Sequence, residues 1–132
     1  MKKLIALVAL VTALTGISFA QGAPLPVEGT WGTTFTNNGF TFDLSITLAN
    51  QQITTRNVCF LPGHDLTAAV TVPARYDDSS VTILAEGQNH VSDNGMNCDV
   101  SVQAGRMNYA IEGASLVLTR DGYPDQVVLE RR

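Results

Sequence analysis

Two histidines, His64 and His90, are the side chains in this sequence most suited to binding a metal ion or transferring a proton near neutral pH. Each lies in a stretch rich in turn-forming residues, and a carboxylate, Asp65 or Asp93, is close by in the sequence. Met96 adds a thioether, which is a soft ligand for copper. The pattern indicates a candidate metal or acid–base site of His64, His90 and Met96 at the rim of the fold. The structural alternative is two exposed loop histidines, with Met96 packed against the rim.

The only two cysteines, Cys59 and Cys98, indicate one disulfide in an exported protein. A metal or redox pair would be close in sequence or joined by histidines at ligand spacing, and neither holds here. The bridge would close a loop of about 40 residues, which the chain-entropy relation values at about 4 kcal/mol. We therefore expect the disulfide to supply a large share of the stability of a small domain.

The remaining polar residues do not form a recognisable catalytic motif. Asp77 and Asp78 are adjacent, so in an extended chain they point apart and do not pair for acid–base catalysis. The serines lack the Gly-x-Ser-x-Gly setting of a nucleophile, and no phosphate-binding glycine motif occurs. We expect a protein that is not an enzyme and needs no cofactor. A hydrolase or a metal-binding protein is the less favoured alternative.

The beginning of the chain has the order of a secretory signal peptide over residues 1–20. Lys2 and Lys3 precede an apolar run, Leu4–Leu14, and the small-residue stretch Ser18–Ala20 follows. A membrane anchor is the alternative, but the apolar run is shorter than the roughly 20 residues that a span requires. We expect the mature protein to be exported, to the periplasm or the medium, and to leave the membrane once the signal is removed.

The charge of the mature chain argues against nucleic acid and anionic membrane surfaces as partners. Of the 8 basic residues, 2 lie in the signal peptide, and the other 6 are arginines scattered along the chain, against 12 acidic residues. The resulting net charge is about −6, without the clustered positive charge that those partners need. Residues 21–28, with two prolines, are expected to form an extended leader before a single domain, residues 29–132.

The stretch Phe40–Leu48 alternates apolar and polar residues without interruption, which is typical of a strand with one buried face. It follows Asn38-Gly39, the dipeptide that best suits a two-residue hairpin turn. This turn would pair Trp31 with Ile46 and place every large apolar side chain of both strands on one face. A three-residue turn would send the two apolar faces opposite ways, which the register rules disfavour.

Strand-like runs at short, even spacing and the absence of a useful helix predict an all-β fold, an antiparallel meander closed into a small barrel. A β-sandwich is the alternative. Nine candidate strands are one too many for an up-and-down antiparallel barrel, so either the last strand or a weaker middle one lies outside it, or the sheet stays open. Residues 87–97 show no periodic spacing of apolar residues and are predicted to form a long loop. The first candidate strand lies just before Asn38. The other eight are Phe40–Leu48, Ile53–Phe60, Leu66–Val72, Val81–Glu86, Cys98–Ala104, Arg106–Ile111, Ser115–Arg120 and Gln126–Arg131.

The tripeptide Gly29-Thr30-Trp31 resembles the Gly-x-Trp opening of lipocalin-like (calycin) barrels. In that superfamily the tryptophan closes one end of the barrel under an arginine of the last strand. The resemblance implies that Arg120 covers Trp31 if the meander ends there, or Arg131 if Gln126–Arg131 belongs to the barrel. The first hairpin is also similar to that of avidins, but biotin sites use several tryptophans and the mature chain has one, so biotin binding is not implied.

These observations predict a non-enzymatic exported barrel that binds a small apolar ligand or a protein partner. An eight-stranded interior either is filled by side chains or holds one small ligand, and short strands favour the filled case. The alternative, from another class, is an inhibitor or adhesion-type protein that offers the leader or the loop 87–97 to its partner.

Overall fold

The computed structural model describes residues 25–132, so the expected signal peptide and the first part of the leader lie outside the described residues. This part of the chain contains no helix with the length and hydropathy to cross a bilayer. The described chain folds into strands joined by tight turns. They are β1 (Gly29–Asn37), β2 (Phe40–Ala49), β3 (Gln52–Leu61), β4 (His64–Tyr76), β5 (Ser80–Ile83), β6 (Gly87–Asp93), β7 (Met96–Val102), β8 (Gly105–Glu112), β9 (Ser115–Thr119) and β10 (Gln126–Arg131).

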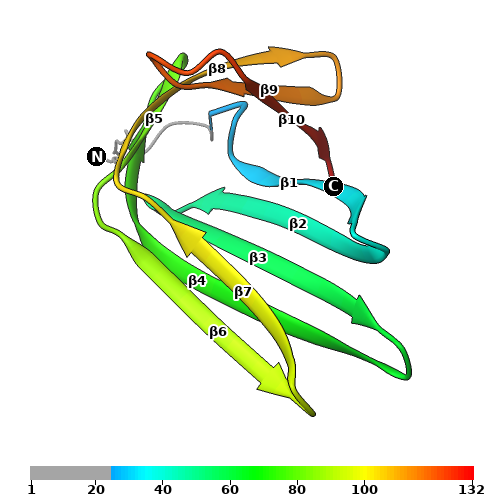
Figure 1. The fold of residues 1–132 in the computed structure, drawn as a ribbon. Helices are drawn as coiled ribbons and strands as arrows, with labels where there is room; N and C mark the ends of the chain where they lie inside the picture. The colour runs from blue at the N-terminus through cyan, green and yellow to red at the C-terminus, as the bar shows by residue number, and fades with distance from the viewer. Residues whose placement is uncertain (1–24) are drawn as a thin grey trace, which may run out of the picture.

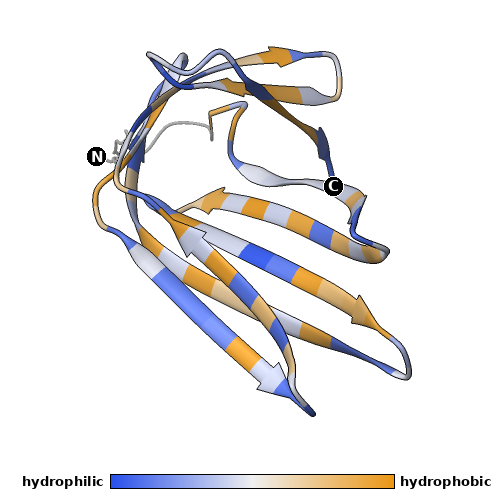
Figure 2. Cartoon of the chain, in the orientation of Figure 1, coloured by the Kyte–Doolittle hydropathy of each residue, from blue (hydrophilic) through white to orange (hydrophobic). Residues whose placement is uncertain are grey.

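Eight of these strands form a closed antiparallel barrel in the order β1-β10-β9-β8-β5-β4-β3-β2, and β6 and β7 form a separate hairpin (Figure 1). The predicted all-β fold with an antiparallel barrel is confirmed. The alternation of apolar and polar residues along β2 appears as bands in Figure 2, and Ile46 and Leu48 of this strand are buried in the barrel core.

The predicted register of the first hairpin is also confirmed. Asn38 and Gly39 occupy the turn with φ of 53° and 81°, the left-handed region that such a turn needs. Trp31 pairs with Ile46, and Phe35 pairs with Phe42 across the same face. The turn therefore sets the register that buries one face of both strands.

The prediction of a loop over residues 87–97 is wrong, because most of this stretch is strand β6 and its turn into β7. β6 escapes pattern recognition because only Val91 among its residues packs against a core, while its other side chains are polar and largely exposed. Asn94 and Gly95, with φ of 52° and 78°, make the turn. Of the nine predicted strands the one outside the barrel is β7, a middle one, and the last strand belongs to the barrel.

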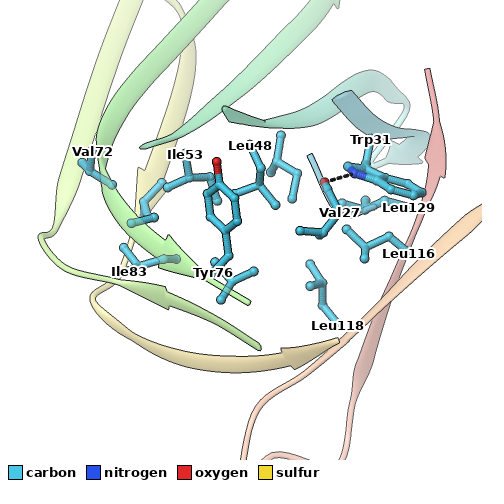
Figure 3. Close-up of a cluster of buried hydrophobic side chains, with 14 residues drawn as sticks. Val27, Trp31, Leu48, Ile53, Val72, Tyr76, Ile83, Leu116, Leu118 and Leu129 are labelled. Atoms are coloured by element: carbon cyan, nitrogen blue, oxygen red, sulfur yellow. Dashed lines mark hydrogen bonds between the residues drawn. The ribbon is translucent and has the colours of Figure 1, made fainter. Parts of the chain in front are cut away.

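One end of the barrel is closed by the segment before β1. The expected extended leader is, over Leu25–Glu28, a turn in which the Glu28 amide donates to the Leu25 carbonyl, 2.9 Å away. Val27 and Trp31 are fully buried, and the Trp31 indole N–H donates to the Val27 carbonyl at 2.8 Å (Figure 3). The Tyr76 hydroxyl donates to the Glu28 carboxylate at 2.5 Å. This end of the barrel, the Trp31 end, is sealed by apolar packing with its polar groups paired.

β5 pairs with β4 only at Ala74–Tyr76, near the Trp31 end. Toward the other end β3 and β4 pair with each other and extend beyond the barrel. The β6–β7 hairpin covers the inner face of this extension (Figure 1). The predicted disulfide, Cys59–Cys98, joins β3 to β7 with a Cα–Cα distance of 5.9 Å. Around it lies a second apolar core that includes Leu66 and Val100. The hairpin is therefore held to the barrel by its own small core and one covalent bond.

Candidate functional site at the open end of the barrel

An apolar cavity of about 340 Å³ opens at the barrel end opposite Trp31, where the β6–β7 hairpin begins and ends. Its walls come from the interior-facing residues near the open ends of six barrel strands and from the end of β7. We call this cavity the mouth. It is lined by Leu44, Ile46, Ile53, Thr55, Ile83, Ser101, Val102, Gln103, Met107, Leu118, Arg120, Val127 and Leu129.

The floor of the mouth is made of buried side chains that also belong to the barrel core, among them Ile53, Leu118 and Leu129. Its rim is more open, since Val127 is 47% exposed although its side chain lines the cavity. A smaller hollow of about 240 Å³ continues past Val127 toward Tyr123. The mouth is thus a cup with a dry floor and an accessible rim.

Four side chains bring polar atoms to this cup: Thr55, Ser101, Gln103 and Arg120. Arg120 is half-buried and carries the only charge among the residues lining the cavity. Its guanidinium lies beside Gly105, where a Cβ would meet Arg120 Nη2 at 3.7 Å. The mouth therefore combines apolar walls with one cation.

Trp31 is covered by Arg131, the residue expected for a barrel that includes Gln126–Arg131, and not by Arg120, the residue expected if the meander ended there. The Arg131 guanidinium lies 3.9 Å from the centroid of the Trp31 ring and donates to the Glu28 and Pro26 carbonyls, at 2.8 Å each. The reason is topological, because β10 pairs with β1 through Trp31 and Arg131. Arg120 follows β9 at the other end of the barrel.

Of the predicted rim residues, His64 pairs with Asp93, one of the two carboxylates expected beside the histidines, but His64 and His90 are not brought onto a common partner. His64 Nε2, in the turn region of β3 and β4, lies 3.1 Å from the Asp93 carboxylate at the end of β6. His90 instead pairs with Asp99, on the face of the hairpin opposite Val91. Among residues 25–132 there is no group of three or more His, Cys, Asp or Glu side chains suited to a metal ion.

Met96 pairs with Asp93 at the tip of the β6–β7 hairpin and is half-buried there. Two further hollows, of about 570 and 530 Å³, follow the hairpin and are lined mainly by its polar residues, including His90 and Asp99. They lack the apolar floor of the mouth. Of the three predicted rim residues, His90 and Met96 lie on the β6–β7 hairpin, and His64 reaches the hairpin through Asp93.

The strongest electrostatic perturbations lie outside the mouth. Hydrogen bonds from Arg132 hold the pKa of Asp43 below its ordinary value, and the same contact raises the pKa of Arg132. Burial raises the pKa of Tyr76, and the hydrogen bond to Glu28 adds to this effect. Tyr76 is therefore protonated at neutral pH and acts as the donor that closes the Trp31 end.

The sequence did not indicate the mouth as a site, although many of its residues lie in predicted strands. Met107 and Leu118 belong to the predicted strands Arg106–Ile111 and Ser115–Arg120, but a strand prediction does not say where the packed interior stops. Ser101 and Gln103 gave no signal, because they reach the mouth only through the position of the β6–β7 hairpin.

No protein-family model matches this chain, and neither a curated protein nor a solved structure matches it.

Proposed function

We propose that this protein is an exported, non-enzymatic, lipocalin-like barrel that binds a small apolar molecule in the mouth. The observation that carries the proposal is an apolar cup whose far end is sealed by Trp31 and Val27 while its rim is open. Small-molecule sites are typically concave and apolar, with a few polar groups that orient the ligand. Thr55, Ser101 and Arg120 are such groups here.

The size of the mouth limits the ligand. Its volume of about 340 Å³ lies at the lower end of the roughly 300–1,000 Å³ range of ligand pockets. Most of the barrel interior is filled by side chains, as the short strands suggested. The ligand is therefore a compact molecule or a short chain, held by burial of apolar surface at roughly 25 cal/mol per Å² before the costs of association.

The disulfide supports the export part of the proposal. Both cysteines are buried, and their sulfurs bridge two hairpins that are far apart in the sequence. Such structural disulfides persist in oxidising compartments such as the periplasm or the medium. Mass spectrometry of the protein purified from its own source would show a chain that begins near residue 21 and lacks free thiols.

A neutral fluorescent dye, Nile red, tests the binding site with two adjacent substitutions on β10. Val127 and Val128 are 47% and 46% exposed, but only Val127 lines the mouth. Val127→Glu places a carboxylate in the apolar wall, so we expect at least about tenfold weaker dye binding. Val128→Glu adds the same charge on the opposite face and should change the affinity less than about twofold. Absence of saturable dye binding by the unmodified protein would contradict the proposal.

A second candidate function, binding of a protein partner, is favoured by the incomplete pairing of β1 and β10. The ladder between the two strands covers Trp31 with Arg131 and Gly32 with Glu130, and the Arg132 N–H donates to the Thr30 carbonyl, so the part of β1 after Gly32 pairs with β2 alone. Phe35, 43% exposed, lies on this unpaired part of β1. Unpaired strand edges accept an added strand from a partner. The leader is a weaker candidate for this role, because Leu25–Glu28 packs under the barrel.

Capture from the exported fraction tests this second function. In the register of the hairpin, Thr36 belongs to a pair whose backbone groups point away from β2. Thr36→Pro removes its outward N–H, whereas Thr36→Ala keeps it. A partner recovered with the wild type and with Thr36→Ala, but lost with Thr36→Pro, would support strand addition. Equal recovery with both variants would exclude this edge as the contact.

A further inference from the structure

Arg120 stands apart from the other arginines of the described chain. Arg131 covers Trp31, and Arg132 forms an ion pair with Asp43 at 2.7 Å. Arg56, Arg75 and Arg106 are exposed, so water solvates their charges. Arg120 is half-buried in the mouth, and within residues 25–132 it takes part in no ion pair.

The acidic residues nearest in sequence do not neutralise Arg120. Asp121 accepts a hydrogen bond from the Asn108 side chain at 3.2 Å. Asp125 lines the outer hollow together with Arg120, but the two make no contact within ion-pair distance. A guanidinium held against apolar walls gains from a partner that replaces lost water. The chain places this cation in the mouth without supplying its anion.

The surroundings of Arg120 favour a flat oxyanion as that partner. Gly105 has no side chain above the guanidinium, and Met107, Leu118 and Val127 line the cavity beside it. Arginine binds carboxylates through two parallel hydrogen bonds, a geometry that lysine does not reproduce. The apolar walls of the mouth are therefore adjacent to the planar guanidinium of Arg120.

We infer that the mouth takes a monocarboxylate amphiphile, with a short apolar body in the cup and its carboxylate on Arg120. This inference rests on the proposed function, since it names the ligand class of the same cavity. The ligand would enter with its apolar end toward Leu118 and Leu129 and leave its charged end at the rim. The protein carries a net negative charge, which repels anions, so an anionic ligand needs the contact with Arg120 to bind in the mouth.

Competition with bound Nile red tests the inference with two ligands that share a chain and differ in the head group, decanoate and decanol. Arg120→Gln should weaken decanoate binding about tenfold, the effect of losing a charge-assisted hydrogen bond, and change decanol binding less than about twofold. Arg106→Gln removes the same charge from the outer face of β8 and should alter neither ligand. Arg120→Lys should retain part of the preference for decanoate. Circular dichroism of each variant would verify the fold.

Two results separate this inference from the proposed function. If Nile red and decanol bind saturably but decanoate binding is the same in the wild type and Arg120→Gln, the role of Arg120 is overturned and the apolar site stands. If Nile red, decanol and decanoate all fail to bind the wild type saturably, the proposed function falls, and the ligand class falls with it.

Discussion

Two arginines near the end of the chain illustrate how position decides the role of a residue. Arg131 lies at the sealed end, where it stacks on Trp31 and binds two backbone carbonyls. Arg120 lies at the open end, where it lines the mouth. The residue type predicts a cation in both places, and only the pairing of β10 with β1 decides which one covers the tryptophan.

Arg131→Gln should destabilise the fold by about 2 kcal/mol, because it removes a cation–π contact and hydrogen bonds of a charged donor. The free energy of unfolding in urea, followed by the fluorescence of Trp31, measures this effect. Arg120→Gln is the matched control, and we expect a change below about 0.5 kcal/mol. Equal losses in the two variants would contradict the assignment of Arg131 as the closing residue.

The Asp43–Arg132 pair gives a pH-dependent contribution to stability. Hydrogen bonds from Arg132 lower the pKa of Asp43 below 3.8, so the folded state binds this proton less readily than the unfolded chain. The pair therefore stabilises the fold above about pH 4, and its contribution disappears as the pH falls through the folded-state pKa of Asp43.

Arg132→Gln should lower the free energy of unfolding by about 1 kcal/mol at neutral pH, the upper range for a partly exposed ion pair. Urea unfolding at a series of pH values should show the two proteins converging in acid. A difference that persists unchanged at pH values well below the folded-state pKa would show that Arg132 acts through packing instead of charge.

At the scale of the elements, the β6–β7 hairpin is the part of the fold that depends on the disulfide. Its own core is small, and it has no place in the barrel. The chain between the cysteines spans a separation of 39 residues, for which the chain-entropy relation gives about 4 kcal/mol.

Reduction of Cys59–Cys98 should therefore lower the free energy of unfolding by up to about 4 kcal/mol without loss of the β signal in circular dichroism. Hydrogen exchange should become faster in β6 and β7 first, because they lose their covalent tie while the barrel keeps its pairing. A Cys59→Ser, Cys98→Ser double variant provides the same comparison without a reducing agent. Uniform acceleration over the barrel strands would show that the hairpin and barrel unfold as one unit.

Elements with one buried face could be predicted from sequence, and elements without one could not. Phe40–Leu48 has a complete alternation and a turn dipeptide that fixes its partner, so both the strand and its register follow. β6 has one inward apolar residue, Val91, so its sequence shows no alternating pattern. The strand forms because it pairs with β7. Local pattern is weak wherever a strand is mostly exposed.

At the scale of the whole molecule, the closed antiparallel barrel is predicted from the sequence, whereas the strands that pair to close it are not. The contacts that close the sheet, β5 with β8 and β1 with β10, join strands far apart in the chain. The candidate site depends on the same long-range arrangement, because the hairpin between β5 and β8 brings Ser101 and Gln103 to the mouth. His64, at the start of β4, pairs with Asp93 of the β6–β7 hairpin, whereas His90 of that hairpin pairs with Asp99, so the two histidines bind different carboxylates.

The central claim is that the open end, and not the Trp31 end or the hairpin, binds an apolar molecule. A methyl-resolved NMR titration of the mature protein with decanol tests it most directly, since decanol does not depend on Arg120. The methyl groups of Leu118, Val127 and Leu129 should shift saturably, while those of Val27 and Val91 should stay in place. Saturable shifts confined to Val27 or Val91, or no saturable shift at all, would contradict the account.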